Sequence, residues 1–256
     1  MSRVRTALLP AIVLASGVVA FGCDEIGLGP TDVLSIEFDS LPYPAVVRGD
    51  TLRDENGVPA PLFAVALNAQ GDTVTGAEIS FLALDEGFVT ISPAGIVTSD
   101  ETGTGQVRIV AGVGGLQTLP LSLRVTNEPA LVEAAGAVAD TVEHDLIEPV
   151  QSDPLTVTLR SSPADSLVRG WIVHYEVVTP ADPADVPGAI VASINAQSAS
   201  DTTDESGQAS RRFRVDPPRL PPTGVDTVVI HATVRYRGAP IAGSPVEFTL
   251  LIRPSG

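Results

Sequence analysis

Apolar residues recur at every second position along most of the chain. In residues 118–125 they are Leu119, Leu121, Leu123 and Val125, a spacing that places side chains on one face of a β-strand. Glycine, proline, aspartate or serine bounds each such run, as is typical of short strands joined by turns. The pattern predicts an all-β protein made of β-sandwiches. Further strands are predicted at Leu155, Val157 and Leu159; at Trp171, Val173, Tyr175 and Val177; at Val228, Ile230, Ala232, Val234 and Tyr236; and at Val246, Phe248, Leu250 and Ile252.

Residues 131–146 come closest to a helical composition. Their alanines and glutamates favour a helix, whereas Gly136 in the middle disfavours one by about 1 kcal/mol. We interpret this segment as a linker that runs into the first strand of a following domain.

The sequence also contains two loose internal repeats. GAEISF at 76–81 recurs as GWIVHY at 170–175, and TSDETGTGQVRI at 98–109 recurs as TTDESGQASRRF at 202–213. Repeats of this kind mark copies of one structural unit. We therefore predict two copies of one domain in tandem.

The predicted domains are residues 34–126 and 127–256, and their lengths are near the roughly 100 residues of an immunoglobulin-like sandwich. In the first, the stretch Gly76 to Phe81 and the later Gly105 leading into Val107 resemble the bacterial Ig-like domains of invasin- and intimin-type surface proteins. The resemblance implies a spacer, adhesive or accessory module without enzymatic activity. Fold-level likeness of this kind does not by itself transmit a function.

The N-terminus has the pattern of an export signal. Arg3 and Arg5 precede an uncharged, largely apolar run that ends at Gly22, which is too short and too interrupted for a spanning helix. Residues 1–22 are therefore predicted to be a cleaved signal peptide. No later run is long and apolar enough to span a membrane, so we expect no second membrane segment.

The only cysteine, Cys23, follows this run directly. An apolar segment ending in a small residue and then cysteine resembles the lipobox of bacterial lipoproteins, in which the cysteine becomes the lipidated N-terminus. The resemblance implies a lipid anchor at Cys23, a linker over residues 23–33, and an exported protein held at a membrane of the bacterial cell envelope. Ala20-Phe21-Gly22 also fits an ordinary signal-peptidase site, which would give a soluble secreted protein with a spare thiol.

Charge restricts the partners further. Without residues 1–22 the chain keeps 13 basic residues, all arginine, against 31 acidic ones, a net charge of −18. Such a surface repels phosphate backbones, so we expect no nucleic-acid partner. With a single cysteine no intramolecular disulfide can form, so stability must come from packing.

No motif for catalysis, phosphate binding or metal binding is present, so the sequence predicts no enzyme, no cofactor and no metal site. His174 and His231 are predicted on solvent-facing strand positions, and His144 in the linker. The acidic turns at 100–101 and 201–205 are the alternative, as calcium-binding loops in equivalent positions of the two copies.

Arg211, Arg212 and Arg214 stand out from this acidic surround, and we expect them to pair with neighbouring carboxylates on an outward strand face. Trp171 is in phase with Val173 and Tyr175, so we predict that it packs in the sandwich core.

Two functions follow from these observations. The first is a non-enzymatic cell-envelope lipoprotein whose Ig-like domains act as a spacer or as an adhesion or interaction module. The alternative is a polysaccharide- or protein-binding accessory component of an envelope enzyme or transport system. An exposed aromatic strip would favour the alternative, but the chain has only 11 aromatic residues, and most of them lie in the strand-core phase.

Overall fold

The structure is a computed structural model, and it describes residue 29 and residues 31–145, 147–217, 220 and 226–255. The predicted signal peptide and Cys23 lie outside the described residues. The regular elements of the described residues are β-strands, together with a 3-10 turn, η1, at Pro183–Asp185. Among these residues, no helix has the length and apolar character needed to cross a membrane.

Strands β1 to β9 form a first sandwich. One sheet has the order β2-β9-β7-β4, with β8 paired to β7, and the strand pairs β1–β3 and β5–β6 complete it. In the four-strand order, β2 runs parallel to β9 and the other pairs are antiparallel. The bounds are β1 Ser35–Glu37, β2 Ala45–Val47, β3 Val65–Leu67, β4 Ser80–Ala83, β5 Val89–Ile91, β6 Val97–Ser99, β7 Gly105–Val113, β8 Leu116–Gln117 and β9 Leu121–Thr126.

Strands β10 to β22 form the second sandwich. One sheet has the order β11-β22-β19-β14-β17, and the other has the order β10-β13-β18-β15-β16 with β12 also on β18. A short hairpin, β20–β21, stands apart from both sheets. The bounds are β10 Leu131–Ala134, β11 Ala139–His144, β12 Val150–Gln151, β13 Leu155–Arg160, β14 Ile172–Thr179, β15 Gly188–Ser193, β16 Ala196–Gln197, β17 Ser200–Thr202, β18 Gln208–Val215, β19 Asp226–Thr233, β20 Arg235–Tyr236, β21 Ala239–Pro240 and β22 Val246–Pro254.

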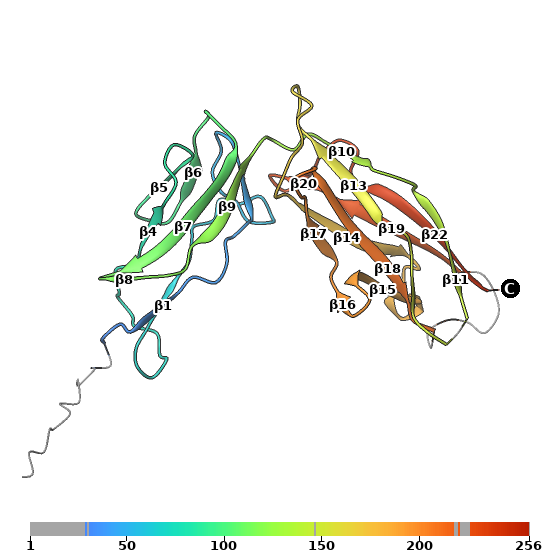
Figure 1. Ribbon diagram of the computed structural model, residues 1–256, viewed down its shortest axis with the longest axis horizontal. Helices are drawn as coiled ribbons and strands as arrows, with labels where there is room; N and C mark the ends of the chain where they lie inside the picture. The colour runs from blue at the N-terminus through green and yellow to red at the C-terminus, as the bar shows by residue number, and fades with distance from the viewer. Residues whose placement is uncertain (1–28, 30, 146, 218–219, 221–225, 256) are drawn as a thin grey trace, which may run out of the picture.

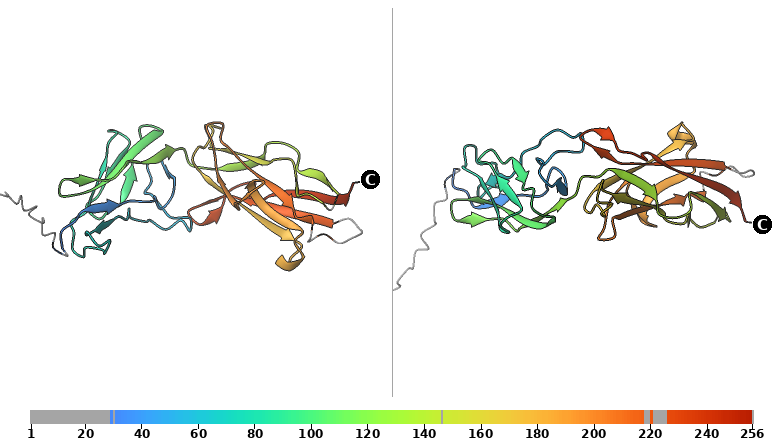
Figure 2. Two further views of the ribbon diagram at one scale, coloured as in Figure 1. Left: turned by 60° about the horizontal axis from the view of Figure 1, so that its bottom comes forward. Right: turned by 90° about the horizontal axis from the view of Figure 1, so that it is seen from above.

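The two sandwiches lie end to end along the long axis of the molecule (Figures 1 and 2). Strand β1 lies at the outer end of the first, and β22 leads to the opposite end of the second. Their apolar side chains form one connected buried cluster that reaches across the junction. The all-β, Ig-like sandwich fold predicted from the alternation is therefore confirmed.

The alternation also identified most of the core. Its positions on β13 and β19, and those of β22 from Phe248 onward, are buried, and so are Leu123 and Val125 on β9. Leu119 is an exception, with 87% of its surface exposed. The strand begins only at Leu121, because Pro120 before it has no N–H to donate to a ladder.

Two predictions are corrected by the strand pairing. Residues 131–146 contain two strands, β10 and β11, where we expected a linker, because each pairs with a strand of the second sandwich. The repeat pairing is right for 76–81 and 170–175, which lead into β4 and β14 at matching sheet positions. It is wrong for the second pair, since β7 lies between β9 and β4, whereas β18 belongs to the opposite sheet of its sandwich.

Candidate functional site at the junction of the two sandwiches

The junction between the sandwiches is built around three aromatic rings. Trp171 of the second sandwich is only 6% exposed and lies between Tyr43 of the first, at 4.8 Å between ring centroids, and Tyr236 of the β20–β21 hairpin, at 5.9 Å. Its indole Nε1 donates to the carbonyl of Arg235 at 3.0 Å. Burial of Trp171 was predicted, but its place is the contact between two domains, where a large ring with one polar atom packs well.

Tyr43 also makes a polar contact across the junction. Its Oη accepts a hydrogen bond of 2.9 Å from the backbone N–H of Ile172, the first residue of β14. Burial raises the pKa of the Tyr43 hydroxyl well above its usual range, so this group stays neutral at any physiological pH. This neutral, buried hydroxyl therefore fixes the position of Tyr43 against the start of β14.

Backbones from the two sandwiches also touch at two glycines. A Cβ added to Gly57, in a loop of the first sandwich, would lie 2.3 Å from the backbone of Arg237 and of Gly238. A Cβ added to Gly238 would lie 2.7 Å from the carbonyl oxygen of Asn56. Both glycines also have positive φ, which side chains rarely adopt. The loop and the hairpin can approach this closely only because neither glycine has a side chain.

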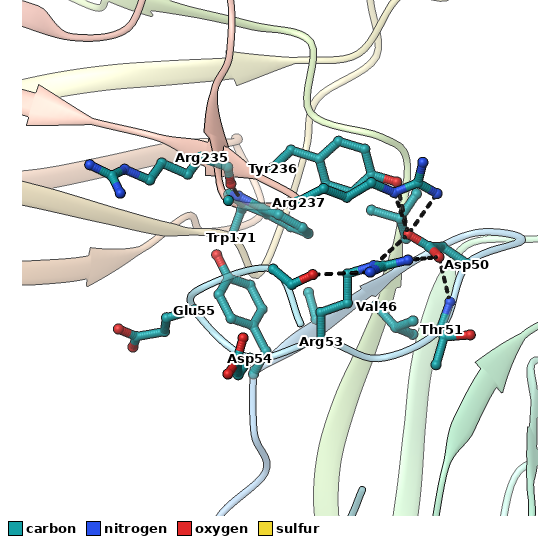
Figure 3. Close-up of a pocket in the computed structure, with 15 residues that line it drawn as sticks. Val46, Asp50, Thr51, Arg53, Asp54, Glu55, Trp171, Arg235, Tyr236 and Arg237 are labelled. Carbon is teal, nitrogen blue, oxygen red and sulfur yellow. Dashed lines mark hydrogen bonds and ion pairs between the residues drawn. The ribbon is translucent and has the colours of Figure 1, made fainter. Parts of the chain in front are cut away.

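Asp50, at the end of the turn after β2, is the polar centre of the junction (Figure 3). Within its own sandwich its carboxylate accepts hydrogen bonds from the Thr51 N–H at 2.8 Å and from the Arg53 guanidinium at 3.0 and 3.1 Å. From the second sandwich it accepts the Tyr236 hydroxyl at 2.9 Å and the Arg237 Nε at 3.2 Å. One carboxylate thus joins a loop of the first sandwich to the β20–β21 hairpin of the second.

The electrostatics of Asp50 follow from this geometry. Its side chain is 10% exposed, and burial alone would raise its pKa. Hydrogen bonds from Arg53, Thr51, Tyr236 and Arg237 to the charged form outweigh burial, so the pKa lies well below its usual range. The carboxylate is therefore charged whenever the protein is folded near neutral pH.

A second set of charges closes the other side of the junction. Arg124 of β9 and Arg169 of the second sandwich both pair with Glu205. Nearby, the Arg169 N–H donates to the Thr126 hydroxyl at 3.2 Å. These pairs are partly exposed and contribute less than the Asp50 cluster.

Little free space remains around Asp50 and Trp171, although larger hollows lie beside Tyr43 and Ile172, about 250 Å³, and beside Arg124 and Arg169, about 300 Å³. The hollow around Asp50 and Trp171 has a volume of about 20 Å³ for water-sized spheres, close to that of one water molecule. It is therefore too full to take a ligand, and its contacts serve to hold the two sandwiches together. No sequence pattern marks this junction, since Tyr43, Asp50 and Arg237 lie outside the strands that alternation reveals.

The residues singled out from sequence do not gather in one place. His174 and His231 lie on outward positions, as predicted, at 3.7 Å from Glu55 and 3.3 Å from Glu247. His144 is buried on β11, where we expected a linker, because alternation along that strand turns it inward. No group of three or more His, Cys, Asp or Glu within the described ranges could hold a metal ion.

Two arginines of the cluster pair with carboxylates, and one of these carboxylates belongs to an acidic turn. Asp201 pairs with Arg211 at 3.0 Å, and Arg214 pairs with Asp216 at 2.8 Å, as expected of neighbouring charges. Arg212 instead donates to the carbonyl of Ser152 at 2.7 Å.

Asp204 caps its own turn. It accepts hydrogen bonds from the Ser206 hydroxyl, the Ser206 N–H and the Gln208 N–H, and these bonds lower its pKa. We expected the two acidic turns to be equivalent, and this is wrong. They precede β7 and β18, which do not occupy corresponding sheets of the two sandwiches.

No protein-family model and no curated protein matches the chain. Among solved structures, it is similar to the adhesin InvE of Yersinia pseudotuberculosis, at 17% identity and a TM-score of 0.35, over 82% of this chain and 56% of that one. It is also similar to domains 4 and 5 of the S-layer protein SbsC, at 14% identity and a TM-score of 0.30, over 85% and 96% of the two chains. A third is the D0-D1 domain of intimin, at 14% identity and a TM-score of 0.27, over 84% and 98%. The chain thus spans little more than half of the length of InvE, and likeness at these values is not evidence for a shared function.

Proposed function

We propose that this protein is an exported, lipid-anchored, non-enzymatic component of a bacterial cell envelope, whose two Ig-like sandwiches form a stiff spacer that presents an interaction surface. The observation that carries the proposal is the Asp50 junction, which joins the sandwiches through buried aromatic and ionic contacts. Two domains of one chain move relative to each other unless the interface between them is large and well packed.

The placement of the chain ends fits this role. Cys23 precedes the first sandwich in sequence, and the C-terminal strand β22 leads to the far end of the second (Figure 1). A lipid anchor at Cys23 would therefore hold the first sandwich near the membrane and project the second away from it. More than one acyl chain on that residue gives stable membrane attachment.

Attachment is tested by labelling the wild-type protein and a Cys23→Ser variant with radioactive palmitate in a bacterial host, followed by fractionation. We expect label on the wild type alone and loss of the variant from the membrane fraction. Absence of label on both would show that Ala20-Phe21-Gly22 is an ordinary cleavage site, and the anchored role would be wrong.

A further inference from the structure

The two sandwiches share a core of four strands in one sheet, and the sheets differ at the edge beyond the fourth strand. The order β2-β9-β7-β4 of the first matches β11-β22-β19-β14 of the second, including the parallel pairing of the first two strands. The second sheet continues with β17, which pairs with Ile172–His174 of β14. Over the described residues β4 has no such neighbour, so the sheet of the first sandwich ends in an open edge.

The open edge of β4 presents backbone groups that another strand can use. The N–H of Leu84 donates to the carbonyl of Arg108 on β7, at 2.8 Å. Because bonding alternates along an antiparallel strand, the N–H and C=O groups of Phe81 and Ala83 point the other way, toward the open side. Unpaired edge groups of this kind are a ready template for an added strand.

A groove runs along this edge, between β4 and the neighbouring strand β5. Phe81 and Ala83 line one side, Val89 and Ile91 line the other, and its volume for water-sized spheres is about 270 Å³. On the outer side of the sheet, Leu82 is 56% exposed and Leu84 is 40% exposed. The apolar walls therefore offer burial to side chains on both faces of an incoming strand, in contrast to the small hollow around Asp50 and Trp171.

The charges at the groove decide which strand fits. Asp85 and Glu86 lie at one end, and Glu78 precedes β4 at the other. Asp85 is paired with Arg108, but in the described part of the chain neither Glu78 nor Glu86 has an ion-pair partner. Two free carboxylates flanking an apolar groove favour an occupant with a basic residue at each end.

A second copy of this chain fits poorly by the same criterion. If two β4 strands paired in antiparallel fashion about Leu82, Glu78 of one copy would lie opposite Glu86 of the other, at both ends of the pair. Like charges placed opposite each other destabilise a strand pair. The whole chain is also strongly acidic, with a net charge of −16.

We propose that the β4 edge of the first sandwich binds an extended segment of another protein, with alternating apolar residues and arginine or lysine at both ends, as an added β-strand. The inference rests on the proposed interaction role and names the partner of that role. Main-chain hydrogen bonds would give affinity, and the apolar and acidic walls would give specificity.

The test uses the exported full chain with Cys23→Ser and a fluorescent nonapeptide, arginine-arginine-valine-threonine-valine-threonine-valine-arginine-arginine. Fluorescence anisotropy at low salt is expected to show saturable binding that weakens as salt is added. The same peptide with its five central amides N-methylated, and a version with glutamate for arginine, are expected to bind at least tenfold more weakly. Equal binding of the N-methylated peptide, or no binding of the first peptide, would overturn the proposal.

Two variants locate the site. Ala83→Pro removes an N–H on the open side and leaves the β4–β7 ladder bonds in place, and Glu86→Lys reverses the charge at one end of the groove. Each is expected to lower the affinity for the peptide at least tenfold. Glu176→Lys, an equal charge change on β14, is expected to leave that affinity within twofold of the parent value. If Glu86→Lys and its control behave alike in folded protein, the groove is not the site.

Sedimentation of the same proteins tests the other occupant. A dimer that Ala83→Pro dissociates would show that a second copy fills the edge, and the proposed partner would be wrong. Palmitate labelling at Cys23 is unaffected by any of these outcomes, so failure of the docking site and failure of the anchored role are distinguishable.

Discussion

The Asp50→Ala substitution is expected to loosen the junction without unfolding either sandwich. It removes the acceptor for the Tyr236 hydroxyl at 2.9 Å and the ion pair with Arg237 at 3.1 Å. A hydrogen bond to a charged group contributes about 1.5–3 kcal/mol, and the ion pair with the exposed Arg237 adds little to this. The closed junction should therefore lose roughly 1.5–3 kcal/mol, or about 10- to 140-fold in its equilibrium constant.

The assay is the distance distribution between two spin labels, one on each sandwich, measured by pulsed electron resonance. Exposed turn residues suit the labels, so Ala94→Cys and Asn195→Cys are introduced together with Cys23→Ser. We expect a narrow distribution in the parent protein and a broad one after Asp50→Ala. Asp85→Ala is the matched control, since it removes a carboxylate paired with an arginine inside one sandwich. Equally narrow distributions in both variants would refute the assignment of stiffness to Asp50.

Further predictions concern the same contacts. Gly57→Ala should cost more stability than Gly71→Ala in urea unfolding, since both glycines have φ near +80° but only the first meets backbone, at 2.3 Å; equal losses would argue against a close approach. The pKa of Asp50 is lowered by folding, so its stabilisation is complete above about pH 5 and is lost as the pH falls below about 4. As the pH falls below about 4, the melting temperature should fall less in Asp50→Asn than in the parent, since Asp204 and other carboxylates with a lowered pKa contribute equally in both. Tyr43→Phe leaves the Ile172 N–H without its acceptor, and thermal unfolding should show a loss of about 1–2 kcal/mol.

Much of the fold was predictable because sandwich cores are regular. A strand with one face buried must alternate, so core positions such as Val157, Ile230 and Phe248 could be identified from spacing alone. The segment 131–146 was misjudged because its alanines and Gly136 conceal two short strands that are stabilised by pairing and not by composition.

The contacts of the junction could not be predicted from the sequence, because no local spacing of residues marks them. Asp50 occupies an ordinary turn after β2, and its partners Tyr236 and Arg237 are 186 and 187 residues away in sequence. Trp171 was correctly placed as buried, but alternation says only which face of a strand it occupies. Whether that face meets its own sandwich or a neighbour depends on how the domains dock, which a single sequence does not encode locally.

Trp171 is the only tryptophan of the chain, and it lies where the two sandwiches meet. Its fluorescence therefore reports on the environment of the junction alone. If the sandwiches separate, the indole becomes hydrated and its emission shifts to the red, whereas circular dichroism follows the strands of both sandwiches. A tryptophan transition that precedes the loss of strand signal would record separation of two still-folded domains, without any label on the protein.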